Sequence, residues 1–218
     1  MTFRQIYEST WYHPVFFWVA GLAFFVWFAR RFPFLHAYVV VFTVEILADA
    51  LLTSEWSPVR EAWKLPVAIG FVVLGDFRYF LLVERARAGA LGVRAIAIAL
   101  GISFVVPVLS YVPQIVVPSA YADPRVAYIT YEAMFVVLAI VVLVWLWRGA
   151  FADADQKRWA MRVTYFEIVQ YALWAAADAV ILRGVDAGYA LRLVPNTMYY
   201  VFFIPFVAWS MPRELGAR

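Results

Sequence analysis

Seven apolar segments, each of about 20 residues, divide the 218-residue chain almost from end to end. About 20 helical residues cross the hydrocarbon core of a bilayer, and lipid offers no partner to a backbone N–H or C=O group. With 66% hydrophobic and 15% charged residues, the chain lies far outside the composition of a soluble globular domain. The sequence therefore predicts an all-α, multi-pass protein of the cell (inner) membrane. The predicted spans lie at about 11–30, 34–53, 64–84, 91–111, 126–148, 159–182 and 191–210.

The links between these segments are short and unequally charged, and the short links indicate one heptahelical domain over 1–218. Eleven lysines and arginines fall on one side of the membrane and six on the other, with Arg78 inside, which accounts for all 18. Because cytoplasmic links are enriched in these residues, the N-terminus is predicted outside and the C-terminus inside. The eleven are Arg30, Arg31, Arg85, Arg87, Arg94, Arg148, Lys157, Arg158, Arg162, Arg213 and Arg218, and the six are Arg4, Arg60, Lys64, Arg125, Arg183 and Arg192.

Three sequence landmarks recur in the same order in the first three and the last three segments. VWFAR at 26–30 corresponds to VWLWR at 144–148, EILADAL at 45–51 to EIVQYAL at 167–173, and DFRYF at 76–80 to NTMYY at 196–200. This pattern predicts a 3+1+3 arrangement of parallel repeats, whose interface is a common place for a site. The alternative is that apolar helices resemble one another because they draw on few residue types. Repeat 1 would span about 11–84, the linker helix 91–111 and repeat 2 about 126–210.

The sixth segment carries a polar stripe. Glu167, Tyr171, Trp174 and Asp178 recur at i, i+4, i+7 and i+11, which places them on one face of a helix. Each carboxylate inside a bilayer costs about 2.5–3.5 kcal/mol on insertion scales, so this face is expected to meet a cavity or a partner helix. The structural alternative is a hydrogen-bonding stripe that only holds the helices together.

The other intramembrane polar residues fall at two depths. At about 1.5 Å per helical residue, Glu45 and Asp76 lie near the bilayer midplane. Asp49, Glu132, Asp178 and Asn196 lie within about 10 Å of the outer helix ends. These depths predict a funnel with acids at its mouth and a floor of Glu45, Asp76, Glu167 and Arg78, in which Arg78 and Glu167 form a structural ion pair.

Aromatic residues are interleaved with these acids. Ring faces beside buried carboxylates suit a cation, whether a bound ammonium or a transient carbocation. A carboxylic acid desolvated without a cationic partner favours its protonated form and can donate the proton. The simpler alternative is that the tyrosines only pack. The predicted substrate-binding residues are Asp49, Tyr131, Glu132, Tyr171, Trp174, Asn196 and Tyr199.

Several chemistries are excluded by the residues present. The chain has no cysteine and only two histidines, so we expect no thiol nucleophile, no metal site and no cofactor. There is no HExxH, GxSxG or phosphate-binding loop. The basic residues report on topology, and no nucleic-acid partner is expected.

Two short runs resemble a known family, the small seven-helix integral-membrane terpene cyclases of the fungal meroterpenoid type and their bacterial relatives. The run Phe42–Leu47 (FTVEIL) resembles the helix-two run around that family's intramembrane glutamate, and Asp76–Tyr79 (DFRY) resembles its helix-three run. The resemblance implies an acid pair that initiates cyclisation. This chain departs from the family in the seventh segment, where Asn196 stands in place of the second acid, so Asp178, Asp76 or Glu167 would have to substitute.

The 3+1+3 topology is also similar to that of SWEET sugar exporters and opsin-like heptahelical proteins. The resemblance to both stops at topology. The seventh segment has no lysine for a retinal Schiff base, and the prolines of SWEET helices two and six are absent.

The sequence thus favours an enzyme that cyclises or isomerises an isoprenoid or lipid-like substrate, with Glu45, Asp178 and Asp76 as catalytic carboxyls. The alternative is a transporter or channel for a small polar or cationic solute, and a third hypothesis is a seven-helix sensor. The expected partners are a hydrophobic or cationic small molecule and membrane lipids. The sequence does not indicate an oligomeric state.

Overall fold

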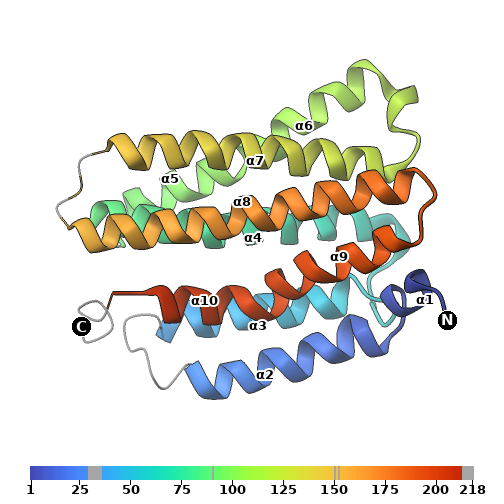
Figure 1. Cartoon of the computed structure of the whole chain (residues 1–218), viewed down its shortest axis with the longest axis horizontal. Helices are drawn as coiled ribbons and strands as arrows, with labels where there is room; N and C mark the ends of the chain where they lie inside the picture. Colours follow the sequence, from blue (N-terminus) through green and yellow to red (C-terminus); the bar gives the residue numbers. More distant parts are fainter. Residues whose placement is uncertain (29–35, 90, 150, 152, 213–218) are drawn as a thin grey trace. The chain divides into compact units, whose positions relative to one another are not determined.

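The computed structural model describes residues 1–28, 36–89, 91–149, 151 and 153–212, and within them it confirms the predicted all-α class, with no strand. Figure 1 shows the helices and their order. They are α1 (Phe3–Tyr7), the π-helical turn η1 (Trp11–Phe16), α2 (Phe17–Phe28), α3 (His36–Leu52), α4 (Glu61–Ala88), α5 (Val93–Ser103), α6 (Val105–Val116), the 3₁₀ turn η3 (Pro118–Tyr121), α7 (Pro124–Arg148), α8 (Ala154–Leu182), α9 (Ala187–Thr197), the π-helical turn η4 (Met198–Phe202) and α10 (Phe203–Ser210).

Five helical stretches among the described residues are long and apolar enough to cross a membrane, which indicates a membrane protein. They are Glu61–Ala88, Val93–Val116, Pro124–Arg148, Ala154–Leu182 and Ala187–Ser210. The first two predicted spans correspond to η1 with α2 and to α3, which border the undescribed residues 29–35. The count of seven, the repeat and the orientation stay predictions, and Arg30, Arg31, Arg213 and Arg218 lie outside the described residues.

Outward-facing apolar side chains also suit a bilayer. On α7 the buried residues Phe135, Ala139, Val142 and Leu146 recur at helical spacing. The opposite face carries exposed valines, including Val137, which is 62% exposed. The exposed face of a helix in a soluble protein usually carries polar residues, whereas valine side chains are compatible with contact to lipid.

Local sequence sets the helix ends. The carboxylate of Asp123 accepts the N–H of Arg125 at 2.9 Å and caps α7, whose first residue is a proline. The carboxylate of Asp153 caps α8 in the same way. At the other end of α7, the ammonium of Lys157 donates to the carbonyl of Trp147 at 2.6 Å, satisfying a carbonyl of the last turn. These contacts satisfy backbone groups at both ends of α7 and at the start of α8.

The contacts divide the chain into two compact units. Unit 1 comprises Met1–Leu74 and Asn196–Arg218, and unit 2 comprises Gly75–Pro195. In unit 1, α2 packs along α3 and against η4. The fully buried ring of Phe17 stacks on Tyr200 with 4.3 Å between centroids, and the indole N–H of Trp18 donates to the carbonyl of Leu47 at 3.0 Å.

In unit 2, α7 and α8 pack side by side along their lengths, and α6 also packs on α7 (Figure 1). The ring of Phe135 on α7 is fully buried and stacks on Tyr171 of α8 with 3.8 Å between centroids. The ring centroid of Phe80 on α4 lies 6.0 Å from that of the same Phe135. An aromatic core therefore joins α4, α7 and α8 and fixes the faces that carry the polar residues.

The start of α9 closely approaches the end of α8. A Cβ atom at Gly188 would lie 2.6 Å from Cγ1 of Ile181, 2.8 Å from its backbone nitrogen and 3.0 Å from the carbonyl oxygen of Ala177. Two of these atoms belong to the backbone, so only the helices themselves could move.

We expect Gly188→Ala to lower the free energy of unfolding by about 1–3 kcal/mol, the usual cost of overpacking. The measurement is thermal or denaturant unfolding in detergent micelles. Gly101→Ala on α5 is the control, because nothing lies within 4 Å of a Cβ atom there. Equal stability of the two variants would contradict the proposed close packing.

Candidate functional site

Asp76 lies near the middle of α4 and is held by tyrosines from two other helices. Its side chain is 1% exposed. The hydroxyl of Tyr171 on α8 donates to Oδ1 at 2.6 Å, and the hydroxyl of Tyr131 on α7 donates to Oδ2 through a short hydrogen bond. Both carboxyl oxygens therefore accept a phenol hydrogen bond, and three helices meet at this one side chain.

Aromatic rings surround Tyr171, one of the two tyrosines that hold this acid. Tyr171 lies between Phe135, on which it stacks, and Trp174, whose ring centroid is 5.1 Å away in an edge-to-face arrangement. The rings of Tyr131 and Tyr171 lie 6.4 Å apart. Ring faces beside a carboxyl group are the arrangement that can stabilise a cation.

Two further buried charged side chains lie near Asp76. Arg78 follows it on α4 and is fully buried, and Glu167 on α8 is 2% exposed. The guanidinium of Arg78 interacts electrostatically with both Asp76 and Glu167. Among the described residues, Oε1 of Glu167 has no hydrogen-bond partner. The predicted ion pair between Arg78 and Glu167 stays a prediction.

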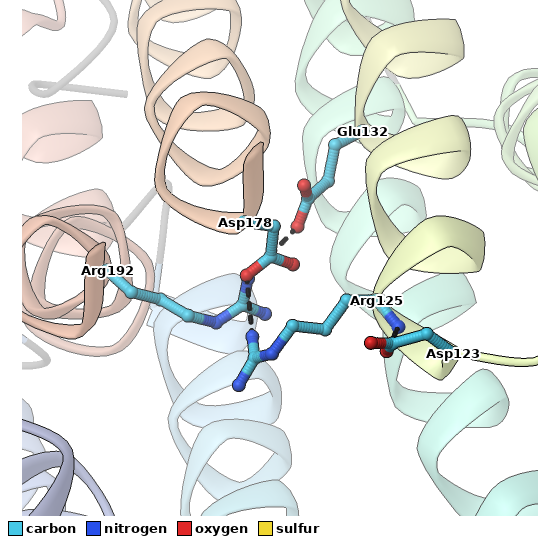
Figure 2. Close-up of polar contacts among 5 residues, drawn as sticks. All are labelled: Asp123, Arg125, Glu132, Asp178 and Arg192. Atoms are coloured by element: carbon cyan, nitrogen blue, oxygen red, sulfur yellow. Dashed lines mark hydrogen bonds and ion pairs between the residues drawn. The ribbon is translucent and has the colours of Figure 1, made fainter. Parts of the chain in front are cut away.

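A second cluster lies where α7 begins, α8 ends and α9 begins (Figure 2). Oδ1 of the fully buried Asp178 accepts a hydrogen bond from Nη1 of Arg125 at 2.7 Å. The same oxygen forms a short ion pair with Nη1 of Arg192. The same Nη1 of Arg192 lies 3.5 Å from Oε1 of Glu132. Two arginines thus converge on one carboxylate oxygen, and the ion pairs connect three helices.

Tyrosine rings support both arginines. The guanidinium carbon of Arg125 lies 5.2 Å from the ring centroid of Tyr189, and that of Arg192 lies 5.9 Å from the ring centroid of Tyr128. These distances are within the range of a cation–π interaction. The cluster is therefore a charge-compensated junction of α7, α8 and α9.

Unit 1 contains two more acids, one helical turn apart on α3. The hydroxyl of Tyr199 donates to Oε1 of Glu45 at 3.4 Å, and the hydroxyl of Tyr200 donates to Oδ2 of Asp49 at 2.8 Å. Glu45 and Asp49 are 8% and 5% exposed. Asn196 is half-buried in this unit, just before η4.

Five buried carboxyl groups fall into two classes according to their partners. Asp76, Glu45 and Asp49 accept hydrogen bonds from tyrosines, whereas Asp178 and Glu132 pair with arginines. The predicted floor would combine Glu45 of unit 1 with Asp76, Arg78 and Glu167 of unit 2, and it stays a prediction. The described residues include no group of three or more His, Asp or Glu side chains that could hold a metal ion.

The sequence did not single out Arg125, Arg192, Tyr200 or Gln170 as site residues. The depth of each residue in the membrane, judged from its distance to the helix end, could have indicated the two arginines as partners of Asp178. Arg125 is in the first turn of α7, Asp178 is four residues from the end of α8, and Arg192 is five residues beyond the start of α9. A buried carboxylate needs a compensating charge, and these were the nearest cations at its depth.

The fold and these clusters define a helical membrane protein with buried carboxyl groups. Comparison with family models, with curated proteins and with solved structures gave no match for this chain. Its function is therefore argued from the chemistry of its own side chains.

We expect Asp178→Asn to lower the free energy of unfolding by about 3–5 kcal/mol, because removing one partner of a buried ion pair leaves the other charges uncompensated. Chemical unfolding in micelles measures this loss. Asp155→Asn is the matched control. Asp155 pairs with Arg158 but is 50% exposed, and an exposed pair contributes only about 0–1 kcal/mol. If the free energy of unfolding fell by the same small amount in both variants, the junction would be unimportant to stability.

Proposed function

We propose that this protein is an integral-membrane enzyme that uses buried carboxyl groups for acid-initiated cyclisation or isomerisation of an isoprenoid or lipid-like substrate. The observation that carries the proposal is the Asp76 carboxyl group, which is buried among aromatic rings with a tyrosine hydroxyl on each oxygen. The resemblance of the runs around Glu45 and Asp76 to membrane terpene cyclases adds support.

The proposed reaction begins with transfer of a proton from Asp76 to the substrate. The O–H bond of Asp76 breaks as a C–H bond forms on a substrate alkene, which leaves a carbocation. The hydroxyls of Tyr131 and Tyr171 then stabilise the Asp76 carboxylate, and the neighbouring rings stabilise the cation. In a cyclisation, a second alkene attacks the cation, which closes a ring and forms a new carbocation. In both reactions a carbon next to the cationic carbon then loses a proton, and the electron pair of the broken C–H bond forms a new alkene. Return of that proton to the Asp76 carboxylate regenerates the acid, so no co-reactant is consumed.

Glu45 is the second proposed carboxyl group, as the resemblance implies. We assign Asp178 to the junction at the end of α8, where it positions α7 and α9 through Arg125 and Arg192. Trp174 and Tyr171 would shape the substrate-binding surface.

The test is turnover by the purified protein in nanodiscs, with farnesyl and geranylgeranyl diphosphates, their alcohols and the corresponding epoxides as substrates, and with products analysed by gas chromatography and mass spectrometry. Asp76→Asn and Glu45→Gln are each expected to reduce turnover at least about 100-fold, since general acid catalysis contributes about 10²–10⁴-fold. Wild-type turnover by the Asp76→Asn variant would refute the proposal.

Two further variants separate chemistry from folding. Tyr171→Phe removes the hydroxyl that reaches Asp76 but keeps the ring that stacks on Phe135. We expect it to remain folded while turnover falls about tenfold, the factor expected for one hydrogen bond. Asp155→Asn makes the same chemical change as Asp76→Asn at an exposed position and should leave turnover unchanged.

A transporter for a small cationic solute is the second candidate. One observation favours it: the acid–tyrosine pairs Glu45–Tyr199 and Asp49–Tyr200 are one turn apart on α3, so a cation could pass from one carboxyl group to the next. This candidate predicts uptake of organic cations into proteoliposomes that is lost in Asp49→Asn. Turnover of isoprenoids without any such flux would exclude it.

A further inference from the structure

The carboxamide of Gln170 is a buried polar group of unit 2 that the proposed proton transfer does not use. Gln170 lies within α8 and is fully buried. Among the described residues, neither its Nε2 nor its Oε1 has a hydrogen-bond partner. Buried amides are almost always hydrogen-bonded, because an unpaired donor or acceptor loses its solvation without compensation.

Glu167 lies on the same face of the helix. Residues 167, 170 and 171 are spaced i, i+3 and i+4, so their side chains are neighbours on the helix surface. Oε1 of Glu167 is likewise buried and has no hydrogen-bond partner among the described residues. The third member, Tyr171, donates to Asp76 at 2.6 Å. The amide and the carboxyl group therefore lie within one turn of each other on α8, beside the tyrosine that reaches the proposed acid Asp76 on α4.

The geometry points to Gln170 and Glu167 as a binding site for the hydroxyl group of a lipid-like ligand. A hydroxyl group both donates and accepts hydrogen bonds, so it can satisfy the N–H group of Gln170 together with a carbonyl or carboxyl oxygen. An ammonium group has no acceptor for the amide N–H group. An anionic head group would meet the two acids Asp76 and Glu167 against the single guanidinium of Arg78. The isoprenoid nature of the ligand rests on the proposed function, whereas the hydroxyl site does not.

The test compares farnesol with farnesene, which has the same type of hydrocarbon chain without the hydroxyl group. Thermal unfolding of the protein in nanodiscs is followed against the concentration of each compound. Farnesol is expected to raise the Tm of the wild type and farnesene to leave it nearly unchanged. In Gln170→Leu, the apparent Kd for farnesol should rise about tenfold, the factor for one hydrogen bond of ordinary strength.

Stability without ligand distinguishes a binding residue from a structural one. Leucine has a similar size and no polar atoms, so Gln170→Leu should unfold at the wild-type Tm or above it. A lower Tm together with an unchanged farnesol response would overturn the inference, since the amide would then serve the fold. Equal responses of the wild type to farnesol and farnesene would overturn it as well.

Gln114→Leu is the matched control. Gln114 lies on α6, and its amide already donates to the carbonyl of Ser110 at 3.0 Å, so its replacement should leave the farnesol response intact. Hexadecanol is the second probe. A response to hexadecanol that depends on Gln170, without one to farnesol, would support the hydroxyl site and count against an isoprenoid substrate. Absence of turnover with a normal farnesol response would count against the proposed enzyme alone.

Discussion

A charge removed from water must find its partner inside the protein, and the helix arrangement of unit 2 depends on this constraint. Asp178 is fully buried, and its two arginines come from helices on either side of α8 in the sequence. Asp76 on α4 likewise receives its two hydroxyls from α7 and α8. Each acid thus connects three helices. Hydrophobic burial between helices contributes little inside lipid, so such polar contacts and close packing decide which faces meet.

The two acids are suited to different tasks because their partners differ. An arginine is always charged, and Asp178 forms ion pairs with two of them. A phenol hydroxyl can satisfy a carboxyl group before and after that group loses a proton. In the proposed enzyme, the cluster near the helix ends would fix the helices while Asp76, near the middle of α4, exchanges a proton. This division would allow a rigid scaffold to surround a reactive centre.

The sequence predicted the helices well, because lipid requires long apolar segments to be helical. The predicted end of the fifth segment at 148 and that of the sixth at 182 coincide with the ends of α7 and α8. The starts were less accurate. α8 begins at Ala154 rather than at 159, because the polar residues 154–158 continue the helix beyond the apolar segment after the cap at Asp153. One end was also too early: α4 extends past 84 to Ala88, and Arg87 in this last turn pairs with Glu84 at 2.6 Å.

Helical spacing indicated which acids share a face, but it could not name their partners. A partner depends on the rotation of a second helix about its own axis, and that rotation is decided by packing. Tyr199 and Tyr200 are adjacent in sequence, yet each reaches a different acid of α3. Arg192 was counted only as an outer basic residue, although the rotation of α9 directs it to Asp178. Gln170 gave no signal at all, because a single glutamine in an apolar run looks like a tolerated polar residue.

The missing side chain at Gly188 has an electrostatic consequence. Gly188 and Arg192 are four residues apart on α9 and so lie on the same face of that helix. The first allows α9 to approach the backbone of α8 at Ala177 and Ile181, and the second reaches Asp178 on that same stretch. The length of the arginine side chain is fixed, so the separation of the two helix axes determines whether its guanidinium reaches the carboxylate. The identity of residue 188 thus sets the strength of an ion pair in which it takes no part, and the effects of substitutions at 188 and 192 should be strongly non-additive.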